Sequence, residues 1–342
     1  MELQQATNEE MKLQNAKELV VETGKMLLEE HLVARTWGNV SARVSKDSFV
    51  ISPSGLDYLQ TTPDDLALVH LDDDLSWEGT RKPSSEKGIH AAAYEAFPDA
   101  GFVIHTHQDY ASAMSVAGFG SLIITNEEIK TLGGLSKAKY GLPGTDKLMK
   151  NVRKKFFKWA KVVVMEHHGV VIVGTDRDDA LKKAILLEEI CKRSVKYRLT
   201  ADVEKARAEG KEVLEDLKST HPNAILVDTP EAIEVATKGM KIHAQLDDMA
   251  QMIGKEIPVT FPVAEALAIA LDEVDAVVAR DVGIFVNSKD EEDAQALALL
   301  AAKAAICALN ADALDVEGRI SAFDCTLMRF VYKNKYSKKK KG

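Results

Sequence analysis

Two apolar stretches limit most strongly how this chain can fold. Residues 101–107 read GFVIHTH, and residues 161–174 read KVVVMEHHGVVIVG, a β-branched run interrupted at a central His-His-Gly. Such runs are typical of strands buried in a sheet, and the second reads as two strands joined by a turn. Helical spacing of apolar residues follows each stretch, from near Asp109 and over residues 178–197. The sequence therefore predicts an α/β fold in which histidines end strands.

The chain before these stretches adds a helix and a hairpin. Residues 12–31 repeat apolar positions at helical spacing, and residues 37–52 alternate as two short strands around a turn. A loop at Pro83 then precedes residues 87–97, which read as a further helix.

A change of composition predicts a boundary between two units. Residues 200–222 are rich in Lys, Glu and Asp and contain the breakers Gly210 and Pro222, so we interpret them as a linker. We expect a catalytic domain over residues 1–210 and a second, smaller α/β unit over residues 211–342.

The second unit resembles a degenerate copy of part of the first. The segment VDAVVARDVGIFVNSKDEEDA aligns without a gap on AKVVVMEHHGVVIVGTDRDDA at an offset of 114 residues, and QLDDMAQMIG aligns on TNEEIKTLGG at an offset of 120. His168 falls on Val282, and nothing near residue 226 replaces a histidine pair. The copy is therefore expected to be a structural or oligomer-forming half without metal ligands.

Charge and composition narrow the possible partners. The formal net charge is −9 and the pI is near 5.6, which argues against nucleic acid because binding it needs clustered cations. The most apolar stretch, Ala294–Leu309, contains Lys303 and is too short to cross a bilayer, so we expect a core helix and no membrane partner. A small molecule is the expected partner.

Three further features bear on localisation. The first residues are polar and lack the apolar core of a signal peptide, so no export is expected. Cys191, Cys307 and Cys325 are far apart and form no CxxC motif, which favours a reducing cytoplasm over disulfides or a thiolate zinc site. The tail Lys338–Lys341 is interpreted as a solvated end rather than an anchor for an anionic surface.

Three histidines form a candidate metal site. His105 and His107 are two residues apart at a strand end, so both side chains point to one face and can reach one ion. His167 and His168 compete for the third position, and the adjacent Gly169 favours His168 because a turn glycine allows close backbone approach. Three imidazoles with an open fourth position are the ligand set of a catalytic zinc.

Glu86 and several short polar residues complete the candidate site. Glu86 opens a helix, where it is either a first-turn charge or, near a metal, a group that moves a proton beside a polarised carbonyl. Short polar residues on tight turns suit a phosphate but are also usual in hairpins. They occur in GNVS, at Ser52–Gly55, and at Ser84 and Ser85, before a helix.

These motifs resemble the class II aldolase and adducin N-terminal domain family. The resemblance extends over roughly residues 12–200 and rests on TWGNVSAR, ISPSGLDY, KPSSEKGIH, PDAGFVIHTH and EHHGVVIVG. It implies a three-layer α/β fold with a central mixed, largely antiparallel sheet flanked by helices, followed here by the smaller aldolase-like unit.

The resemblance also implies a role for each residue. Zinc, or Mn²⁺ or another divalent ion, would be held by His105, His107 and His168, with Glu86 as acid and base. The phosphate of a phosphorylated sugar would be bound by Asn39, Ser54, Gly55, Ser84 and Ser85. Cleavage would give dihydroxyacetone phosphate and an aldehyde through an enediolate.

The sequence departs from the family pattern at two places. Our alignment puts Glu127 where fuculose-phosphate aldolases have a tyrosine, so Glu127 is a candidate second acid or sugar contact, with an exposed helix carboxylate as the alternative. Tyr140 is a further candidate lining residue. Compact members end near residue 210 and are commonly cyclic tetramers, so the resemblance implies a homo-oligomer; a tetramer is one form of it, and the alternative is that the added half covers or replaces the tetramer contact.

Other functions use the same motifs. An epimerase, a dehydratase or a decarboxylase would share the metal site because each stabilises an enolate. A non-enzymatic adducin-like binding protein would keep the fold for interactions, but such relatives tend to lose the metal histidines, which are present here.

Overall fold

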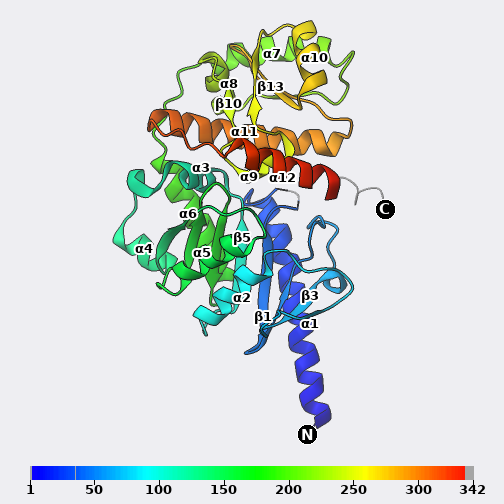
Figure 1. The fold of residues 1–342 in the computed structure, drawn as a ribbon, viewed down its shortest axis with the longest axis vertical. Helices are drawn as coiled ribbons and strands as arrows, with labels where there is room; N and C mark the ends of the chain where they lie inside the picture. Colours follow the sequence, from blue (N-terminus) through cyan, green and yellow to red (C-terminus); the bar gives the residue numbers. More distant parts are fainter. Residues whose placement is uncertain (1, 35, 336–342) are drawn as a thin grey trace. The chain divides into compact units, whose positions relative to one another are not determined.

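The computed structural model describes residues 2–34 and 36–335, which form two compact units (Figure 1). The first unit contains the chain up to Ser115 together with residues 122–193, and the second contains residues 116–121 and the chain from Ser194. The tail Lys338–Lys341 lies outside the described residues.

The first unit is built around one large sheet. Its elements in chain order are α1 (Glu2–Glu29), β1 (Asn39–Ser45), β2 (Ser48–Ile51), the 3-10 turn η1 (Pro63–Asp65), β3 (Ala67–His70), β4 (Trp77–Glu78), α2 (Lys87–Ala96), β5 (Phe102–Thr106), α3 (Asp109–Ala117), α4 (Asn126–Leu132), β6 (Leu135–Ala138), α5 (Asp146–Phe156), β7 (Val162–Met165), β8 (Val170–Gly174) and α6 (Arg177–Ser194).

The sheet has eight strands in the order β4-β3-β2-β1-β5-β8-β7-β6. Only the β6–β7 pair at one edge is parallel, and the other neighbours are antiparallel. The predicted mixed, largely antiparallel sheet is thus confirmed. In the middle of the sheet, the register places His105 opposite Asn39 on β1 and opposite Val171 on β8.

Both faces of this sheet are buried. Alternate strand residues such as Val103, Val163 and Val171 pack with Ile89 of α2 and Leu148 of α5 in one cluster. The intervening strand residues are buried as well: Phe102, Ile104, Val162, Val164, Val170 and Ile172. The near-continuous apolar runs of the sequence therefore reflect a sheet covered on both sides, which is the expected three-layer arrangement.

The second unit is smaller and also mixes helices and strands. Its elements are α7 (Val203–Leu217), β9 (Ile225–Val227), α8 (Pro230–Thr237), β10 (Ile242–His243), α9 (Asp247–Met252), β11 (Glu256–Ile257), β12 (Val259–Thr260), α10 (Ala264–Glu273), β13 (Ala276–Ala279), β14 (Gly283–Val286), α11 (Glu291–Ala313) and α12 (Ala322–Lys335).

The segment predicted as a linker is instead the helix α7. Asp202 caps the helix by accepting a hydrogen bond from the backbone N–H of Lys205, and Gly210 is buried within it. A Cβ at Gly210 would lie 2.7 Å from Leu226 and 2.8 Å from Val282. Gly210 therefore allows α7 to pack closely on the sheet and does not break the helix. The charged, glycine-containing composition of residues 200–222 predicted a linker wrongly. The main part of the second unit begins at Ser194, earlier in the chain than the expected boundary at residue 210.

The four-stranded sheet of the second unit repeats half of the larger sheet. The order β9-β14-β13-β12 has the same neighbours and directions as β5-β8-β7-β6, with two antiparallel pairs followed by a parallel pair. Helices α6 and α11 begin 114 residues apart, at Arg177 and Glu291, and α3 and α8 begin 121 apart, at Asp109 and Pro230. This agreement supports the predicted repeat.

Helix α11 is the long apolar helix of the second unit. By length and composition it could cross a membrane, but 78% of its most apolar window is buried inside the protein. Its Lys303 is buried and pairs with the buried Asp248 of α9. Such burial is the behaviour of a core helix, as the sequence predicts.

Candidate metal centre

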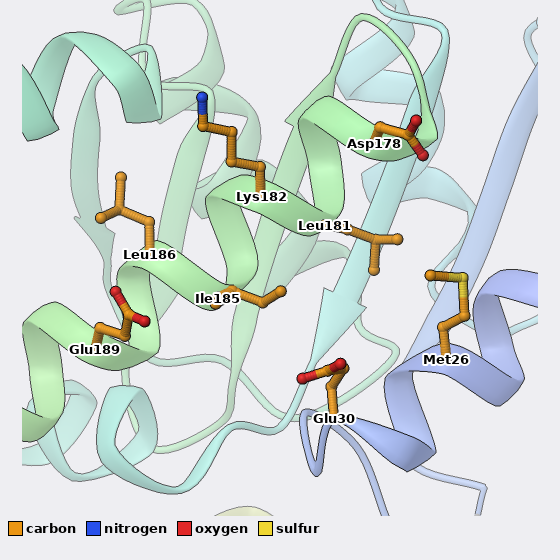
Figure 2. Close-up of a pocket in the computed structure, with 8 residues that line it drawn as sticks. All are labelled: Met26, Glu30, Asp178, Leu181, Lys182, Ile185, Leu186 and Glu189. Atoms are coloured by element: carbon orange, nitrogen blue, oxygen red, sulfur yellow. The ribbon is translucent and has the colours of Figure 1, made fainter.

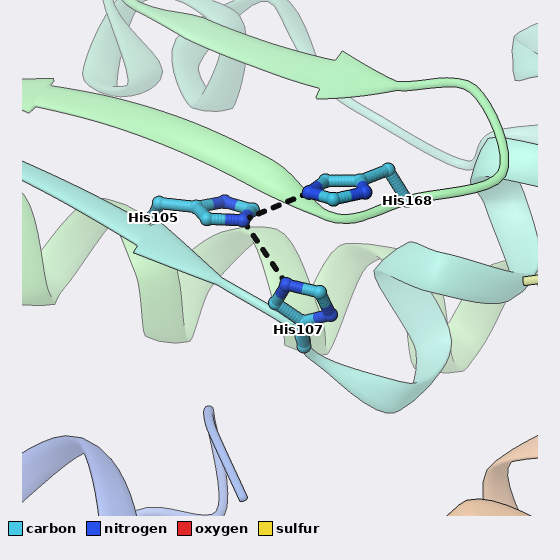
Figure 3. A group of neighbouring side chains, drawn as sticks. All are labelled: His105, His107 and His168. Carbon is cyan, nitrogen blue, oxygen red and sulfur yellow. Dashed lines mark hydrogen bonds between the residues drawn. The ribbon is translucent and has the colours of Figure 1, made fainter. Parts of the chain in front are cut away.

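Three imidazoles converge at the ends of β5 and the β7–β8 turn (Figure 3). The Nε2 atom of His105 lies 3.0 Å from that of His107 and 3.2 Å from that of His168. All three side chains are buried, and their candidate ligand atoms lie within 4.8 Å of one another. The structure therefore brings together the three predicted ligands, although His107 and His168 are far apart in sequence.

Two glycines allow the backbone to bring these rings together. A Cβ at Gly169 would lie 2.3 Å from the carbonyl oxygen of Thr106 and 3.0 Å from the ring of His105. Gly38 has a φ of +85°, and a Cβ there would lie 2.4 Å from the carbonyl oxygen of His105. Any side chain at either position would displace β5 from its neighbours.

The tautomer of His105 follows from its hydrogen bond to the backbone. Its Nδ1 lies 2.9 Å from the carbonyl oxygen of Val170, which can only accept, so Nδ1 carries the proton. Burial lowers the pKa of His105, which keeps the ring neutral. Its Nε2 therefore directs a lone pair towards His107 and His168, as a metal ligand requires.

Glu86 lies against the same cluster. It precedes the first residue of α2 and is buried, with Oε2 3.3 Å from Nε2 of His105 and Oε1 3.2 Å from Nε2 of His168. Oε2 also accepts a hydrogen bond of 3.0 Å from Nδ2 of Asn39, whereas Oε1 has no hydrogen-bond partner among the described residues. The prediction that Glu86 lies near the histidines holds in the geometry.

The charge state of Glu86 is set by two opposing effects. Burial alone raises its pKa, but interactions with the imidazoles of His105 and His168 and the hydrogen bond from Asn39 outweigh burial and hold the pKa well below its ordinary value. A buried carboxylate that is ionised and a neutral imidazole nitrogen are both suited to a divalent cation. The donor set and the orphaned Oε1 therefore fit a divalent metal ion.

The predicted phosphate-binding turns lie side by side. Pro53 and Pro83 form an isolated antiparallel bridge, Ser54 N–H donates to the carbonyl oxygen of Lys82 over 3.0 Å, and Ser84 N–H donates to that of Ser52 over 3.1 Å. This bridge brings Ser54 and Gly55 close to Ser84 and Ser85 at the start of α2. Gly55 has a φ of +74°, which favours glycine at this turn.

Within this group, Asn39 and Ser84 already have partners inside the protein. Both are buried: Asn39 bonds Glu86 and His90, and the Ser84 hydroxyl accepts from the N–H of Glu86 over 3.2 Å. Ser54, Gly55 and Ser85 are more accessible, so they are better placed to contact a ligand directly.

The other candidates are not members of the three-histidine group. Glu127 is exposed in the first turn of α4, and no hydrogen bond or ion pair among the described residues joins its carboxylate to Glu86 or the cluster. His167 has a φ of 61° and packs its ring on Tyr140 at 5.4 Å, so the choice of His168 over His167 agrees with the geometry. A catalytic role for Glu127 stays a prediction.

Sequence reasoning did not single out His90 and Tyr94. They lie one helical turn apart on α2, both are buried, and both contact the hydroxyl of Ser41 on β1. The spacing of four residues between two polar side chains on an otherwise apolar helix face was the available signal.

One hollow of the first unit lies away from the histidines (Figure 2). It has a volume of about 460 Å³ and lies between α1 and α6, where Met26, Leu181 and Ile185 form an apolar floor rimmed by Glu30, Asp178 and Lys182. It contains none of the candidate site residues, and no chemistry-bearing cluster faces it. We therefore place the functional site at the histidines.

The second unit carries different residues at the equivalent positions. The offset of 121 residues between β5 and β9 puts Leu226 at the place of His105, Asp228 at that of His107 and Arg207 at that of Glu86. Arg207 Nε lies 3.3 Å from a carboxylate oxygen of Asp228. An ion pair and apolar side chains thus stand where the first unit has its ligands.

Comparison with known proteins gives a consistent picture. Residues 18–195 match the family described as Class II Aldolase and Adducin N-terminal domain. A 5-methylthioribulose-1-phosphate/5-deoxyribulose-1-phosphate aldolase of Rhodospirillum rubrum is 30% identical over 198 residues, covering 57% of this chain and 87% of the relative.

Two other matches each cover about half of the chain. L-ribulose-5-phosphate 4-epimerase UlaF of Salmonella paratyphi C is 29% identical over 199 residues, covering 53% of this chain and 84% of the relative. A solved L-fuculose 1-phosphate aldolase is 25% identical, covers 52% of this chain and 84% of that protein, and has a TM-score of 0.48.

Proposed function

Because this chain belongs to the class II aldolase and adducin N-terminal domain family, we propose that it is a divalent-metal aldolase acting on a phosphorylated sugar. The reaction would break the bond between C3 and C4 of a ketose 1-phosphate and release dihydroxyacetone phosphate and an aldehyde. One observation carries this proposal: the imidazoles of His105, His107 and His168 converge with the buried carboxylate of Glu86.

Zinc is the ion that we propose for this site, with Mn²⁺ or another divalent ion as the alternative. Three imidazole nitrogens are the ligands of many catalytic zinc sites, and they leave one position open. Such an ion supplies Lewis acidity towards the carbonyl and hydroxyl oxygens of the ketose. Glu86 adds a negative charge that lowers the net charge of the loaded site.

The residues of the chain have separate roles in this reaction. In the cleavage direction, C3 keeps the electron pair of the broken bond, and Glu86, which is ionised in the free protein and must first take up a proton, delivers that proton to C3 from Oε1. In the reverse direction, the same oxygen removes that proton. The hydroxyl proton on C4 must pass to a second base, for which Glu127 remains our candidate. Burial of Glu86 and the histidines excludes bulk water from the carbon that carries the charge.

The phosphate of the substrate is proposed to lie at the paired turns. Ser54, Gly55 and Ser85 offer hydroxyl and backbone donors beside the start of α2, where the helix dipole favours an anion. The Rhodospirillum relative acts, by its name, on 5-methylthioribulose and 5-deoxyribulose 1-phosphates. We therefore propose a 5-deoxy or 5-methylthio pentulose 1-phosphate as the first substrate to test.

Epimerisation is the second candidate function. The relative from Salmonella is named an L-ribulose-5-phosphate 4-epimerase and is nearly as similar to this chain as the aldolase. An epimerase, dehydratase or decarboxylase would use the same histidines. A non-enzymatic, adducin-like role is less favoured because the complete ligand set is present and buried.

The deciding experiment is a substrate screen with purified full-length protein. Four sugar phosphates would be offered with zinc and with chelator: 5-deoxyribulose 1-phosphate, 5-methylthioribulose 1-phosphate, fuculose 1-phosphate and ribulose 5-phosphate. Chelator-sensitive release of dihydroxyacetone phosphate from a ketose 1-phosphate would support the aldolase. Formation of a 4-epimer without release would establish the second candidate, and a protein that retains no ion and turns over none of the four would contradict both.

We also propose a cytoplasmic homo-oligomer in which the second unit serves structure or assembly. The cysteines Cys191, Cys307 and Cys325 are all free and buried, which suits a reducing compartment. The charged pair Arg207–Asp228 and the neighbouring apolar residues leave no metal-ligand set at the equivalent place in the described second unit. Light scattering of the purified protein would test whether the assembly is a tetramer.

A further inference from the structure

A continuous row of buried polar groups runs from α2 to the carboxylate of Glu86. The hydroxyl of Tyr94 lies 2.8 Å from that of Ser41, and the Ser41 hydroxyl lies 2.6 Å from Nδ1 of His90. Nε2 of His90 bonds Oδ1 of Asn39, whose Nδ2 donates to Glu86 over 3.0 Å. All five side chains are buried, and the exposed fraction of His90 and of Ser41 is 0%.

The direction of every hydrogen bond in this row can be assigned. The Glu86 carboxylate only accepts, so the amide NH₂ of Asn39 must face it and Oδ1 of Asn39 must face His90. Oδ1 only accepts, so Nε2 of His90 carries the proton. Burial lowers the pKa of His90 to about 3, so the ring is neutral and its Nδ1 accepts from Ser41.

The row ends at Tyr94. Because the Ser41 proton is used towards His90, the Ser41 oxygen must accept the proton of the Tyr94 hydroxyl. Burial raises the pKa of Tyr94, so this hydroxyl keeps its proton, and the guanidinium of Arg43 lies 4.6 Å from the centre of the ring. Each group therefore has one allowed orientation, and reversing any one of them places two acceptors or two donors face to face.

We propose that His90 is a positioning residue for Glu86: by donating from Nε2 to Asn39, it fixes the Asn39 amide so that Nδ2 holds Oε2 and leaves Oε1 available for proton transfer. This role rests on the proposed function, because it assigns a use to the orientation of Glu86. It does not require His90 to touch substrate or ion. Ser41 fixes the tautomer of His90 by donating to its Nδ1, and Tyr94 fixes the orientation of the Ser41 hydroxyl.

The geometry explains why a positioning device is needed at this carboxylate. Oε1 and Oε2 both lie within 3.3 Å of a ligand imidazole, so an unrestrained carboxylate could rotate and offer either oxygen to either ring. The hydrogen bond from Asn39 distinguishes the two oxygens, because Oε2 accepts it and Oε1 does not. The acceptor-only carboxylate requires the NH₂ group of Asn39 to face it, and the bond from Nε2 of His90 to Oδ1 holds the amide in that place.

Three variants test the inference. His90→Phe removes both ring nitrogens but keeps a planar ring. His90→Gln keeps a donor that can reach Asn39 and an acceptor for Ser41, so it serves as the conservative rescue. Ser41→Ala removes only the group that sets the tautomer. For each, kcat, KM, bound metal and thermal midpoint would be measured with the substrate found in the screen.

We expect His90→Phe to lower kcat by about tenfold to a hundredfold, the effect of weakening the hydrogen bond from Asn39 to the charged Glu86, with KM and metal content little changed. His90→Gln should recover most of that loss, and Ser41→Ala should fall between the two. Equal losses in His90→Phe and His90→Gln, or loss of metal in step with loss of activity, would show a merely structural role.

A measurement without metal or substrate completes the test. In metal-free protein labelled with ¹⁵N at histidine, the resonances of His90, assigned by their absence in His90→Gln, should show one protonated nitrogen and one bare nitrogen from pH 5 to 8. A ring that is protonated at both nitrogens, or that exchanges between tautomers, would overturn the proposal. If wild-type protein turned over no sugar phosphate while His90 showed the expected tautomer, the proposed function would fail and the described network would stand.

Discussion

Oε1 of Glu86 lies 3.2 Å from Nε2 of His168, on a buried carboxylate whose other oxygen is held by Asn39. The two residues come from different parts of the chain, Glu86 from the start of α2 and His168 from the β7–β8 turn. A candidate proton-transfer group therefore lies beside a candidate metal ligand without sharing an element with it. Such an arrangement lets charge at the carboxylate and charge at the site influence each other directly.

Replacement of Glu86 by glutamine should separate metal binding from proton transfer. Glu86→Gln keeps the size of the side chain and leaves the three imidazoles in place, so bound metal should be retained. Turnover should fall by about a hundredfold or more, as for a lost general acid or base. Steady-state kinetics with metal analysis of the same sample would measure both, and undiminished turnover would remove Glu86 from the mechanism.

Glu127→Gln provides the matched comparison for Glu86→Gln. Glu127 is exposed and lies on α4, and its substitution should leave folding and metal content unaltered. If Glu127 is the second base, kcat should fall while bound metal stays constant. Wild-type kinetics in this variant would instead identify it as an ordinary surface carboxylate.

Removal of one imidazole should remove the ion but not the fold. His107→Ala should lose most bound metal and keep its circular dichroism spectrum, because the core of the first unit is large and independent of the ligands. Its control is His167→Ala, which changes a neighbouring histidine that packs on Tyr140. Elemental analysis should find about one ion per wild-type chain, whereas two would mean that the second unit also binds one.

The conformation of Gly38 offers a test of backbone strain. Gly38→Ala adds a Cβ 2.4 Å from the carbonyl oxygen of His105 at a φ of +85°, so it should lower both stability and metal affinity. Gly118→Ala is the matched control, since Gly118 has a φ of +87° and nothing within 4 Å of the added Cβ. We expect a loss of about 1–2 kcal/mol at Gly118 from the positive φ alone and a larger loss at Gly38.

The buried His90 predicts a pH dependence of stability in the metal-free protein. Its pKa falls from an ordinary 6.5 to about 3, because burial disfavours the charged ring. Below pH 6.5 the unfolded chain therefore takes up a proton at His90 that the folded chain does not. The contribution of the neutral His90 to the free energy of unfolding is fully present above that pH and decreases as the pH falls towards about 3. In urea titrations, wild-type protein should lose up to about 1.4 kcal/mol per pH unit more than His90→Gln over this window. Parallel pH profiles for the two proteins would contradict this assignment.

The fold could largely be predicted because its strongest signals are local. The runs at residues 101–107 and 161–174 are long enough to identify buried strands, and the helix spacing after each is unambiguous. Residues 200–222 were misread because charge and glycine predict a linker, whereas α7 uses that charge on its exposed side and Gly210 to approach Leu226 and Val282. Composition does not say which face of a helix meets a sheet.

The candidate site was predictable in its ligands but not in its supporting residues. His105 and His107 share a strand face by spacing alone, and Gly169 identified the turn that carries His168. The row through Ser41 and His90 depends on the register between β1 and its neighbours and on the position of α2 over the sheet, which tertiary packing alone determines. No local sequence pattern predicts that His90 forms a hydrogen bond with the amide of Asn39.

The hydrogen bond from His105 to Val170 has a consequence for assembly of the sheet. Because side chains alternate across a strand, sliding β5 by one residue against β8 would turn His105 to the other face, where it could reach neither His168 nor that carbonyl. Capture of an ion is thus possible only after the central strands have found their proper alignment. The rate of metal uptake during refolding would therefore show when β5 and β8 reach their native register.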